Sequence, residues 1–374
     1  MNTARKSRFR GVRAAVAVAM SLCAMAGALV VDAQAAALPQ MPPLPQLFPE
    51  PGAVVLPRDE APHQNQLEWW YFVGHLHGLD AAGVAREFGY EVTVFQLRPL
   101  NVNSGALYSW HFAITDVNGQ VYRFEERVSA APIPQPRSGF DFTNGDWSVS
   151  GAQQNYHIAA RLGDGGYGID LRTHSDHPFV VHSRVGPGLI DYTPIARTSA
   201  YYSSTSLDTT GTLSLGGQRI AVTGMSWQDR QWFNKTQMEG GGWNWFALQL
   251  DHDTQYMLYF LQDPQTGAIV NTIGTKVVAG RATPLPTNEM SVLPSGSWRS
   301  PASGFTYPTR WRINVPGGQF EITPQVRDQE LVSPGHRTYF EGSSVVTGSL
   351  DGSATTGRAY VEVNPWDQPY TSLP

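Results

Sequence analysis

Cysteine and charge are the scarcest features of this 374-residue sequence. The single cysteine, Cys23, lies in an apolar N-terminal run, so the chain beyond that run has none. Disulfides, thiolate zinc sites, iron–sulfur clusters and cysteine nucleophiles are therefore excluded there. Charged residues make up 15% of the sequence, against roughly 25% in a typical soluble domain. Because no cluster of lysine and arginine follows the N-terminus, we expect no nucleic-acid partner.

The first 35 residues have the pattern of a secretory signal peptide. Five basic residues accompany the apolar run 14–31, and Ala33–Gln34–Ala35 has the small-x-small form of a cleavage site. We expect cleavage after Ala35 and a periplasmic or secreted mature protein. The alternative, an uncleaved N-terminal anchor, rests on the length of the apolar run. Cleavage removes five basic residues and Asp32, and it changes the formal net charge from −5 to −9.

Glycine, proline and aromatic residues are abundant, with 37 Gly, 27 Pro, 11 Trp, 15 Tyr and 16 Phe. The Pro-rich residues 36–66 are expected to form an extended lead-in. From residue 67 onward, short alternating runs separated by turn residues predict β-strands. The predicted strands are 68–77, 89–98, 107–116, 120–128, 155–162, 167–173, 200–207, 211–215, 218–227, 243–251, 255–262, 310–315, 318–323 and 356–364. These exceed one small barrel, so we expect an all-β protein with two tandem antiparallel barrel or sandwich domains, at 67–205 and 206–374.

Two of the predicted strands lack a polar face. Alternate residues of a strand point to opposite sides, so in 68–77 the face of Trp70 and the face of Tyr71 are both aromatic. In 243–251 the face of Trp245 lies opposite a face that carries Phe246, Leu248 and Leu250. Such strands are expected to line a lumen on one side and to pack against a second layer on the other.

Five segments carry distinctive motifs and are, in chain order, Glu68–Leu76, Ser199–Ser203, Gly224–Trp232, Gly242–Asp251 and Gly357–Glu362. Together they resemble one family of secreted lipocalin-like proteins, the AttH-type proteins and carotenoid 1,2-hydratases (hydroxyneurosporene synthases). The first segment is similar to the Glu-Trp-Trp-Tyr-x-x-Gly opening of the family. The resemblance implies two lipocalin-like β-domains with an apolar pocket in or between them. It also implies hydration of isoprenoid alkenes or prenyl groups, or cyclisation. One departure is Arg230, where many secreted relatives carry a histidine.

Hydration of an isolated alkene requires a carboxylic acid that apolar surroundings keep protonated and a wall that stabilises a carbocation. Asp229 is the first candidate acid, with a paired aspartate as the alternative. Glu68 is the second candidate, and a structural salt bridge to an arginine is its more common role. The residues expected to line the cation site are Trp69, Tyr71, His75, Tyr201, Trp227, Gln231, Trp243 and Trp245. Core packing explains any one of these aromatic side chains equally well, so only their grouping is informative.

Metal binding is not indicated. His75 and His77 share a strand face, which allows two imidazoles on one metal, but no third ligand is evident nearby. His174, His177 and His182 lie in a loop-rich stretch that we expect at the surface. We therefore expect no metal and no cofactor.

Two functions of different class remain open. The first is an exported hydratase-like enzyme acting on an apolar isoprenoid, terpenoid or prenylated alkene. The second is a non-catalytic carrier of a hydrophobic ligand; a hydrolase or cyclase of the same family is a further alternative without a nucleophile motif. In each case we expect an apolar small-molecule partner and at most transient contact with a membrane surface.

Overall fold

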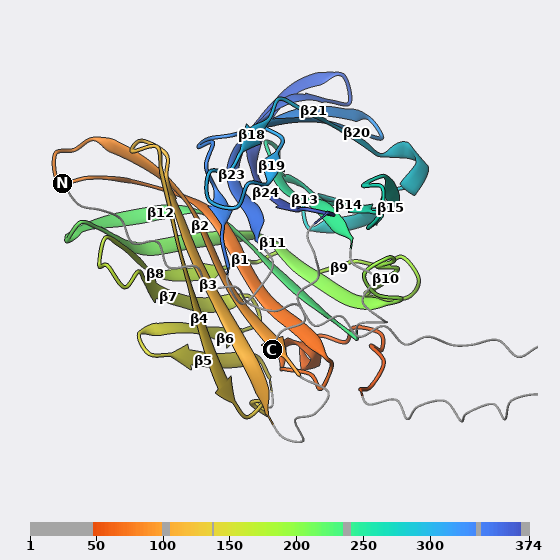
Figure 1. The fold of residues 1–374 in the computed structure, drawn as a ribbon, viewed down its shortest axis with the longest axis horizontal. Helices are drawn as coiled ribbons and strands as arrows, with labels where there is room; N and C mark the ends of the chain where they lie inside the picture. Colours follow the sequence, from red (N-terminus) through yellow and green to blue (C-terminus); the bar gives the residue numbers. More distant parts are fainter. Residues whose placement is uncertain (1–47, 99–104, 137, 235–240, 334–337, 368–374) are drawn as a thin grey trace, which may run out of the picture. The chain divides into compact units, whose positions relative to one another are not determined.

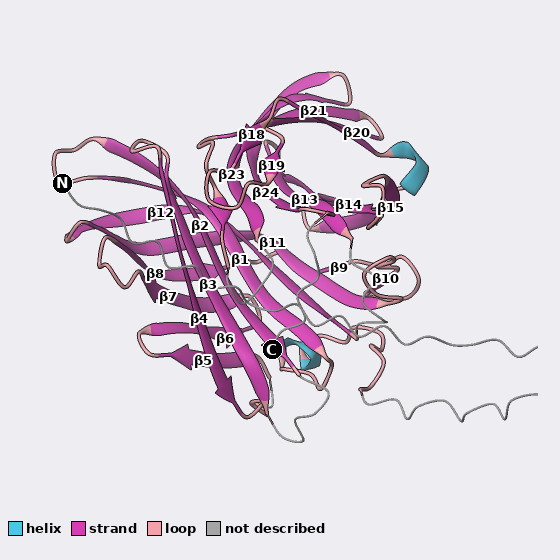
Figure 2. Cartoon of the chain, in the orientation of Figure 1, coloured by secondary structure: helices cyan, strands magenta, loops and turns pink. Residues whose placement is uncertain are grey.

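The computed structural model describes residues 48–98, 105–136, 138–234, 241–333 and 338–367. In these residues the regular secondary structure is antiparallel β-strand (Figures 1 and 2), apart from two single-turn 3₁₀ helices, η1 (Arg58–Glu60) and η2 (Thr287–Glu289). Two large sheets form within one compact unit. The predicted all-β class with two curled antiparallel sheets is therefore confirmed, while the predicted signal peptide lies outside the described residues.

Sheet A holds the first twelve strands, in the order β4-β3-β2-β1-β12-β11-β8-β7-β6-β5, with β9 and β10 also paired to β11. Its strands are β1 (Leu67–Leu79), β2 (Ala85–Leu97), β3 (Ala106–Asp116), β4 (Val121–Ala131), β5 (Phe140–Asn144), β6 (Trp147–Ala152), β7 (Asn155–Arg161), β8 (Tyr167–His174), β9 (Val180–Val181), β10 (Leu189–Ile190), β11 (Ser199–Leu215) and β12 (Gln218–Phe233). Strand β12 is far from β1 in the sequence, but it pairs with β1 from Leu67 to Gly78. The first and last long strands of sheet A are thus neighbours in its centre.

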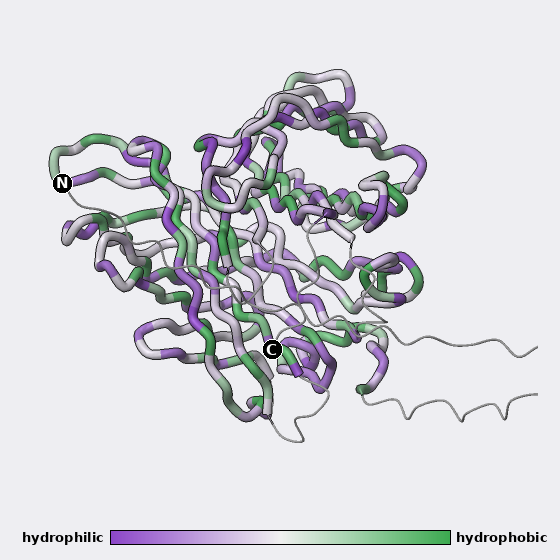
Figure 3. The backbone as a smooth tube through the Cα atoms, viewed as in Figure 1, coloured by the Kyte–Doolittle hydropathy of each residue, from purple (hydrophilic) through white to green (hydrophobic). Residues whose placement is uncertain are grey.

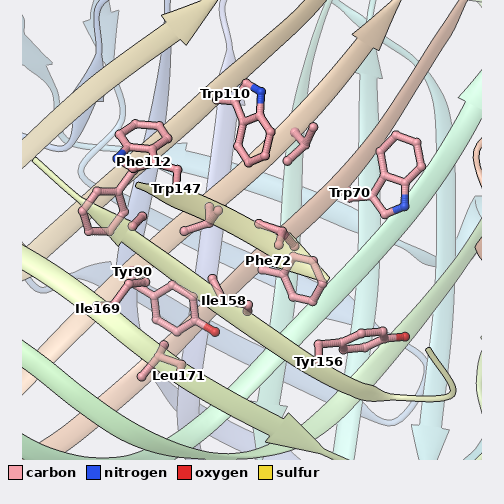
Figure 4. Packing of buried hydrophobic residues seen from close by; sticks show 14 of the residues in the cluster. Trp70, Phe72, Tyr90, Trp110, Phe112, Trp147, Tyr156, Ile158, Ile169 and Leu171 are labelled. Atoms are coloured by element: carbon pink, nitrogen blue, oxygen red, sulfur yellow. The ribbon is translucent and has the colours of Figure 1, made fainter. Parts of the chain in front are cut away.

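Sheet A curls around a core of its own. Trp70 of β1 packs edge-on against Phe142 of β5, with ring centroids 4.5 Å apart, and Phe112 of β3 packs against Trp147 of β6 at 5.8 Å. Strands from the two ends of the sheet therefore share one buried aromatic cluster, part of which Figure 4 shows. The face of β1 that carries Trp70 is filled by packed side chains from its own sheet.

Sheet B holds the remaining strands except for the small pair β18 (Trp298–Arg299) and β19 (Thr306–Tyr307), in the order β16-β15-β14-β13-β24-β23-β21-β20-β17 with β22 on β23. Its strands are β13 (Gly242–Leu250), β14 (Thr254–Gln262), β15 (Ile269–Val278), β16 (Arg281–Pro284), β17 (Ser291–Ser295), β20 (Arg310–Val315), β21 (Gly318–Pro324), β22 (Glu330–Leu331), β23 (Tyr339–Leu350) and β24 (Ser353–Asn364). This sheet also has its own core, in which Phe246 of β13 packs against Trp311 of β20 at 5.9 Å.

A third buried cluster joins the two sheets. It contains Tyr71 of β1 and Trp227 of β12 from sheet A, together with Trp245 of β13, Tyr259 of β14 and Tyr360 of β24 from sheet B. Strands β1 and β13, which the sequence predicted to have no polar face, therefore each place one face in this shared layer: the face of Tyr71 in β1 and the face of Trp245 in β13. Figure 3 shows that hydrophobic and hydrophilic positions are interleaved along the strands of both sheets. We call this cluster the inter-sheet layer.

The division of the chain differs from the expected boundary between residues 205 and 206. That boundary falls inside β11, because the two predicted strands 200–207 and 211–215 are one strand, Ser199–Leu215, with a register shift between Ser204 and Leu207. The chain passes from sheet A to sheet B between Phe233 and Gly242. The described part of the Pro-rich lead-in packs on sheet A: Val54 is buried in a cluster with Trp232.

Candidate functional site

A row of polar residues crosses five strands of sheet A on the face that carries the inter-sheet layer. Register places Ser203 of β11 opposite Asp229 of β12, and Asp229 opposite Tyr71 of β1. Tyr71 is then opposite Thr93 of β2, and Thr93 opposite His111 of β3. Directly opposed residues share a face of an antiparallel sheet. All five side chains are buried, so each needs a hydrogen-bonding partner within the protein.

Asp229 is held by three donors. The hydroxyls of Tyr201 and Ser203 donate to its two carboxyl oxygens, and the Trp227 indole N–H donates to Oδ1 at 2.5 Å. Burial raises the pKa of Asp229 to about 7, although the three hydrogen bonds act in the opposite direction. Among the described residues, no cationic side chain offsets this effect of burial. The group is therefore a carboxylic acid that holds its proton at pH values where an ordinary aspartate is ionised.

Aromatic rings surround this carboxyl. Trp245 of β13 lies edge-on to Trp227 at 6.2 Å and to Tyr71 at 5.3 Å. Its indole N–H donates to Tyr201 Oη at 3.1 Å, and Tyr259 lies 6.1 Å from Tyr201. Indole and phenol faces attract positive charge through their quadrupoles. The structure thus brings together five of the residues predicted for the site, Asp229 with Tyr71, Tyr201, Trp227 and Trp245.

His182 joins this group unexpectedly. The sequence placed it in a surface loop, which is wrong: it follows β9, its side chain is 1% exposed, and its ring lies 4.3 Å from that of Tyr201. Its Nε2 lies 2.8 Å from Ser203 Oγ and its Nδ1 lies 2.9 Å from Thr275 Oγ1. Burial lowers the pKa of His182 to about 3, so the ring is neutral. No periodic pattern in residues 174–198 marks His182 as buried, and only the fold reveals it.

A second group of carboxyls lies on the far side of Tyr71. The Tyr71 hydroxyl donates to Glu341 Oε1 of β23 at 2.7 Å, and Glu341 is directly opposite Glu362 of β24. Burial raises the pKa of Glu341 well above its usual value, and the neighbouring Glu362 and Glu91 raise it further. Strand β23 was not among the predicted strands, so sequence reasoning missed this group.

Glu68 does not belong to the site. It lies on the opposite face of β1, where Arg230 Nη2 donates to it at 2.8 Å and the His63 ring nitrogen Nδ1 lies 2.7 Å away. Arg230 also stacks on Trp70 at 3.8 Å. Burial alone would raise the pKa of Glu68, but the charges of Arg230 and His63 hold it below its usual value. The structural salt bridge is therefore its role in this geometry, and Asp229 and Glu68 do not converge.

The other predicted lining residues lie at the margins of the inter-sheet layer. Trp69 and Trp243 are half-buried against it, and Gln231 accepts a long hydrogen bond from Tyr259 at 3.5 Å. His75 lies further along β1, and the Ser343 hydroxyl is 3.2 Å from its Nδ1. His75 also lines an open pocket of about 810 Å³. Burial lowers the pKa of His75 to about 3, and the Arg358 charge acts in the same direction.

The described residues offer no cluster of three or more His, Cys, Asp or Glu side chains that is suited to a metal ion. Nor does any helix within the described ranges have the length and apolar character to cross a membrane.

A sequence model of the AttH-like family matches residues 48–365, which include both sheets and the whole inter-sheet layer. The chain belongs to the AttH-like family. Among curated proteins, no sequence match was found. The family resemblance inferred from the strand motifs is thus confirmed.

Solved structures share this AttH-like architecture. An AttH protein from Nitrosomonas europaea is 24% identical, with a TM-score of 0.73 over 84% of this chain and 98% of its own. Kievitone hydratase from Nectria haematococca is 18% identical, with a TM-score of 0.66 over 86% of this chain and 95% of its own. CghA is 12% identical, with a TM-score of 0.51 over 87% and 97% of the two chains. At these identities the likeness establishes the fold.

Proposed function

We propose that this AttH-like protein is a hydratase-type enzyme that adds water to an alkene of an apolar isoprenoid, terpenoid or prenylated substrate. The observation that carries the proposal is Asp229, a buried carboxyl whose pKa burial raises to about 7. Its surroundings are indole and phenol rings from both sheets. A protein named as a hydratase, kievitone hydratase, shares the fold. We further propose that the enzyme is exported after removal of residues 1–35.

The geometry suits protonation of a carbon–carbon double bond. The Asp229 carboxyl gives its proton to the less substituted carbon, the π-bond breaks, and a tertiary carbocation forms on the other carbon. The faces of Trp227 and Trp245 stabilise that cation without reacting with it. Water then forms the new C–O bond and releases its surplus proton, and Asp229 takes up a proton again before the next turnover. Each turnover therefore consumes one alkene and one water and leaves the enzyme unchanged.

The three donors to Asp229 have a defined part in this reaction. Hydrogen bonds from Tyr201, Ser203 and Trp227 stabilise the carboxylate that remains after proton transfer. Burial favours the neutral acid before the transfer. Together they place the acidity of Asp229 near neutral pH, where a general acid is most effective.

A panel of acyclic terpenoid and prenylated alkenes in ¹⁸O-enriched water tests the proposal. We expect a labelled tertiary alcohol from at least one alkene and a loss of about 10²–10⁴-fold in rate for Asp229→Asn. The matched control is Asp141→Asn, which changes an exposed aspartate of β5 and should leave the rate unchanged. Absence of labelled alcohol across the panel, or an unchanged rate in Asp229→Asn, would contradict the proposal. Recovery of one unaltered apolar ligand by native mass spectrometry would instead support a carrier.

A further inference from the structure

Of the three donors to Asp229, Ser203 alone leads to a further proton-carrying side chain within the described part of the protein. Trp227 donates through an indole N–H, which has no lone pair with which to accept a replacement proton. Tyr201 in turn accepts from the indole N–H of Trp245, which ends that branch for the same reason. Ser203 Oγ, in contrast, lies 2.8 Å from Nε2 of His182. A hydroxyl and an imidazole each accept and donate protons, so this branch is able to carry one.

The branch crosses from sheet A to sheet B. His182 Nδ1 lies 2.9 Å from Oγ1 of Thr275 on β15. The residue directly opposite Thr275 is Pro284 of β16, the edge strand of sheet B, and all four residues of β16 are exposed. Asp229, Ser203, His182 and Thr275 are themselves each less than one-tenth exposed. A continuous hydrogen-bonded chain therefore runs from the buried carboxyl to the strand beside an exposed edge.

We propose that Ser203 and His182 form a proton relay that connects Asp229 to Thr275 beside the edge of sheet B. When Asp229 is ionised, Thr275 donates to His182 Nδ1, His182 Nε2–H donates to Ser203, and Ser203 donates to Asp229. One proton then passes along each of the three hydrogen bonds, Asp229 becomes protonated, and Thr275 takes a replacement proton from water. The imidazole changes from the Nε2–H to the Nδ1–H tautomer and is never charged. Its burial, which disfavours the imidazolium, is consistent with this form of transfer.

The relay connects the closed apolar site to the strand beside the exposed edge of sheet B. The role of the relay in turnover rests on the proposed hydratase function, because the relay restores the Asp229 proton after the proton released by the attacking water has left the site. The relay itself is a property of the resting protein. Its existence is therefore testable without a substrate.

The decisive measurement is the tautomer of His182, followed by ¹⁵N NMR of histidine-labelled full chain between about pH 5 and about pH 9. We expect the Nδ1–H tautomer at the acidic end, the Nε2–H tautomer at the basic end, and a neutral ring throughout. Three titratable side chains of the described residues also lie around the hydrogen-bonded relay, namely Tyr71, Tyr201 and Tyr259. Burial raises their pKa values well above the usual one, so they stay neutral in this range. Asp229→Asn should abolish the switch. A single tautomer in the wild-type protein at all pH values, or a switch that persists in Asp229→Asn, would overturn the proposal.

A kinetic measurement applies once an alkene from the panel is turned over. Thr275→Val removes the entry of the relay while conserving side-chain shape, and we expect a normal first turnover followed by steady-state turnover at least about tenfold slower. The control, Thr272→Val, removes a hydroxyl on the same strand that donates to the Thr287 carbonyl, and it should change neither phase. A first turnover that slows as much as the steady state would show that Thr275 only supports the structure and would overturn the relay. Failure of every alkene would contradict the hydratase proposal and leave the NMR result to decide the relay.

Discussion

Glu68 and Asp229 are buried carboxyls on neighbouring strands with opposite ionisation. Glu68 on β1 pairs with Arg230 and His63, whose charges hold its pKa below the usual value. Among the described residues, Asp229 on β12 accepts hydrogen bonds from hydroxyl and indole donors only, and burial raises its pKa to about 7. Arg230 is the next residue after Asp229, but successive side chains of a strand point to opposite faces. The Arg230 guanidinium therefore pairs with Glu68 on one face of the sheet. On the other face, Asp229 has no charge partner among the described residues.

The largest effect expected from this contrast is on stability. Arg230→Met leaves Glu68 buried without its main charge partner, and we expect the free energy of unfolding to fall by about 3–5 kcal/mol. Urea unfolding measures the loss. The control is Arg312→Met, which breaks an ion pair with Glu321 whose side chains are 53% and 41% exposed, and it should cost at most about 1 kcal/mol. Equal small losses would show that Glu68 does not depend on Arg230.

The opposite pKa shifts also predict opposite effects of pH on stability. The folded protein binds a proton at Asp229 more tightly than the unfolded chain does, so this group lowers stability as pH rises from about 4 to about 7, by at most about 4 kcal/mol. Glu68 stabilises the fold above its unfolded pKa near 4.5, and this contribution is lost as pH falls through its lower folded value. Urea unfolding of wild type, Asp229→Asn and Glu68→Gln at several pH values separates the two. A wild-type minus Asp229→Asn difference that does not change with pH would contradict the assignment of Asp229.

The alternation of residues 68–77 was sufficient to predict that β1 has two apolar faces, and the structure assigns each face to a separate buried cluster. The sequence motifs also placed Asp229, Trp227 and Tyr201 in one candidate site. The relation between Glu68 and Asp229 depends on the register of β1 against β12, in which Tyr71 opposes Asp229 and Glu68 opposes Trp232. A single sequence does not contain that register, so Glu68 stayed a second candidate acid beside Asp229.

Two further residues of the site, His182 and Glu341, could not be predicted because the sequence around each has no regular pattern. His182 follows a two-residue strand in a stretch without periodicity, and its burial comes from contacts with β11 and β15. Glu341 lies on β23, where Gly342, Ser343 and Ser344 interrupt any alternation of apolar and polar residues. Long-range packing, rather than local pattern, positions both side chains.

The difference between Asp229 and Glu68 also predicts how the reaction rate depends on pH. Because the proposed reaction needs protonated Asp229, we expect the rate with a productive alkene to be level below about pH 6 and to fall about tenfold per pH unit above about pH 7. Glu68→Gln should not move this midpoint, since Glu68 lies on the other face of the sheet. A midpoint that follows Glu68→Gln would show that the two carboxyls act together after all.

The smallest expected effect tests how the three donors set the acidity of Asp229. Trp227→Phe removes the indole N–H that donates to Oδ1 at 2.5 Å and keeps an aromatic ring beside the carboxyl. The ionised form loses a hydrogen bond, so the pKa of Asp229 should rise by roughly one unit, and the falling limb of the rate should move to higher pH by the same amount. The matched control is Trp245→Phe, whose indole N–H donates to Tyr201 rather than to Asp229. The Trp245 hydrogen bond reaches Asp229 only through Tyr201, so its loss should move the falling limb of the rate by less than half as much. Equal shifts in the two variants would show that the indole rings set the acidity of Asp229 by excluding water rather than by donating hydrogen bonds.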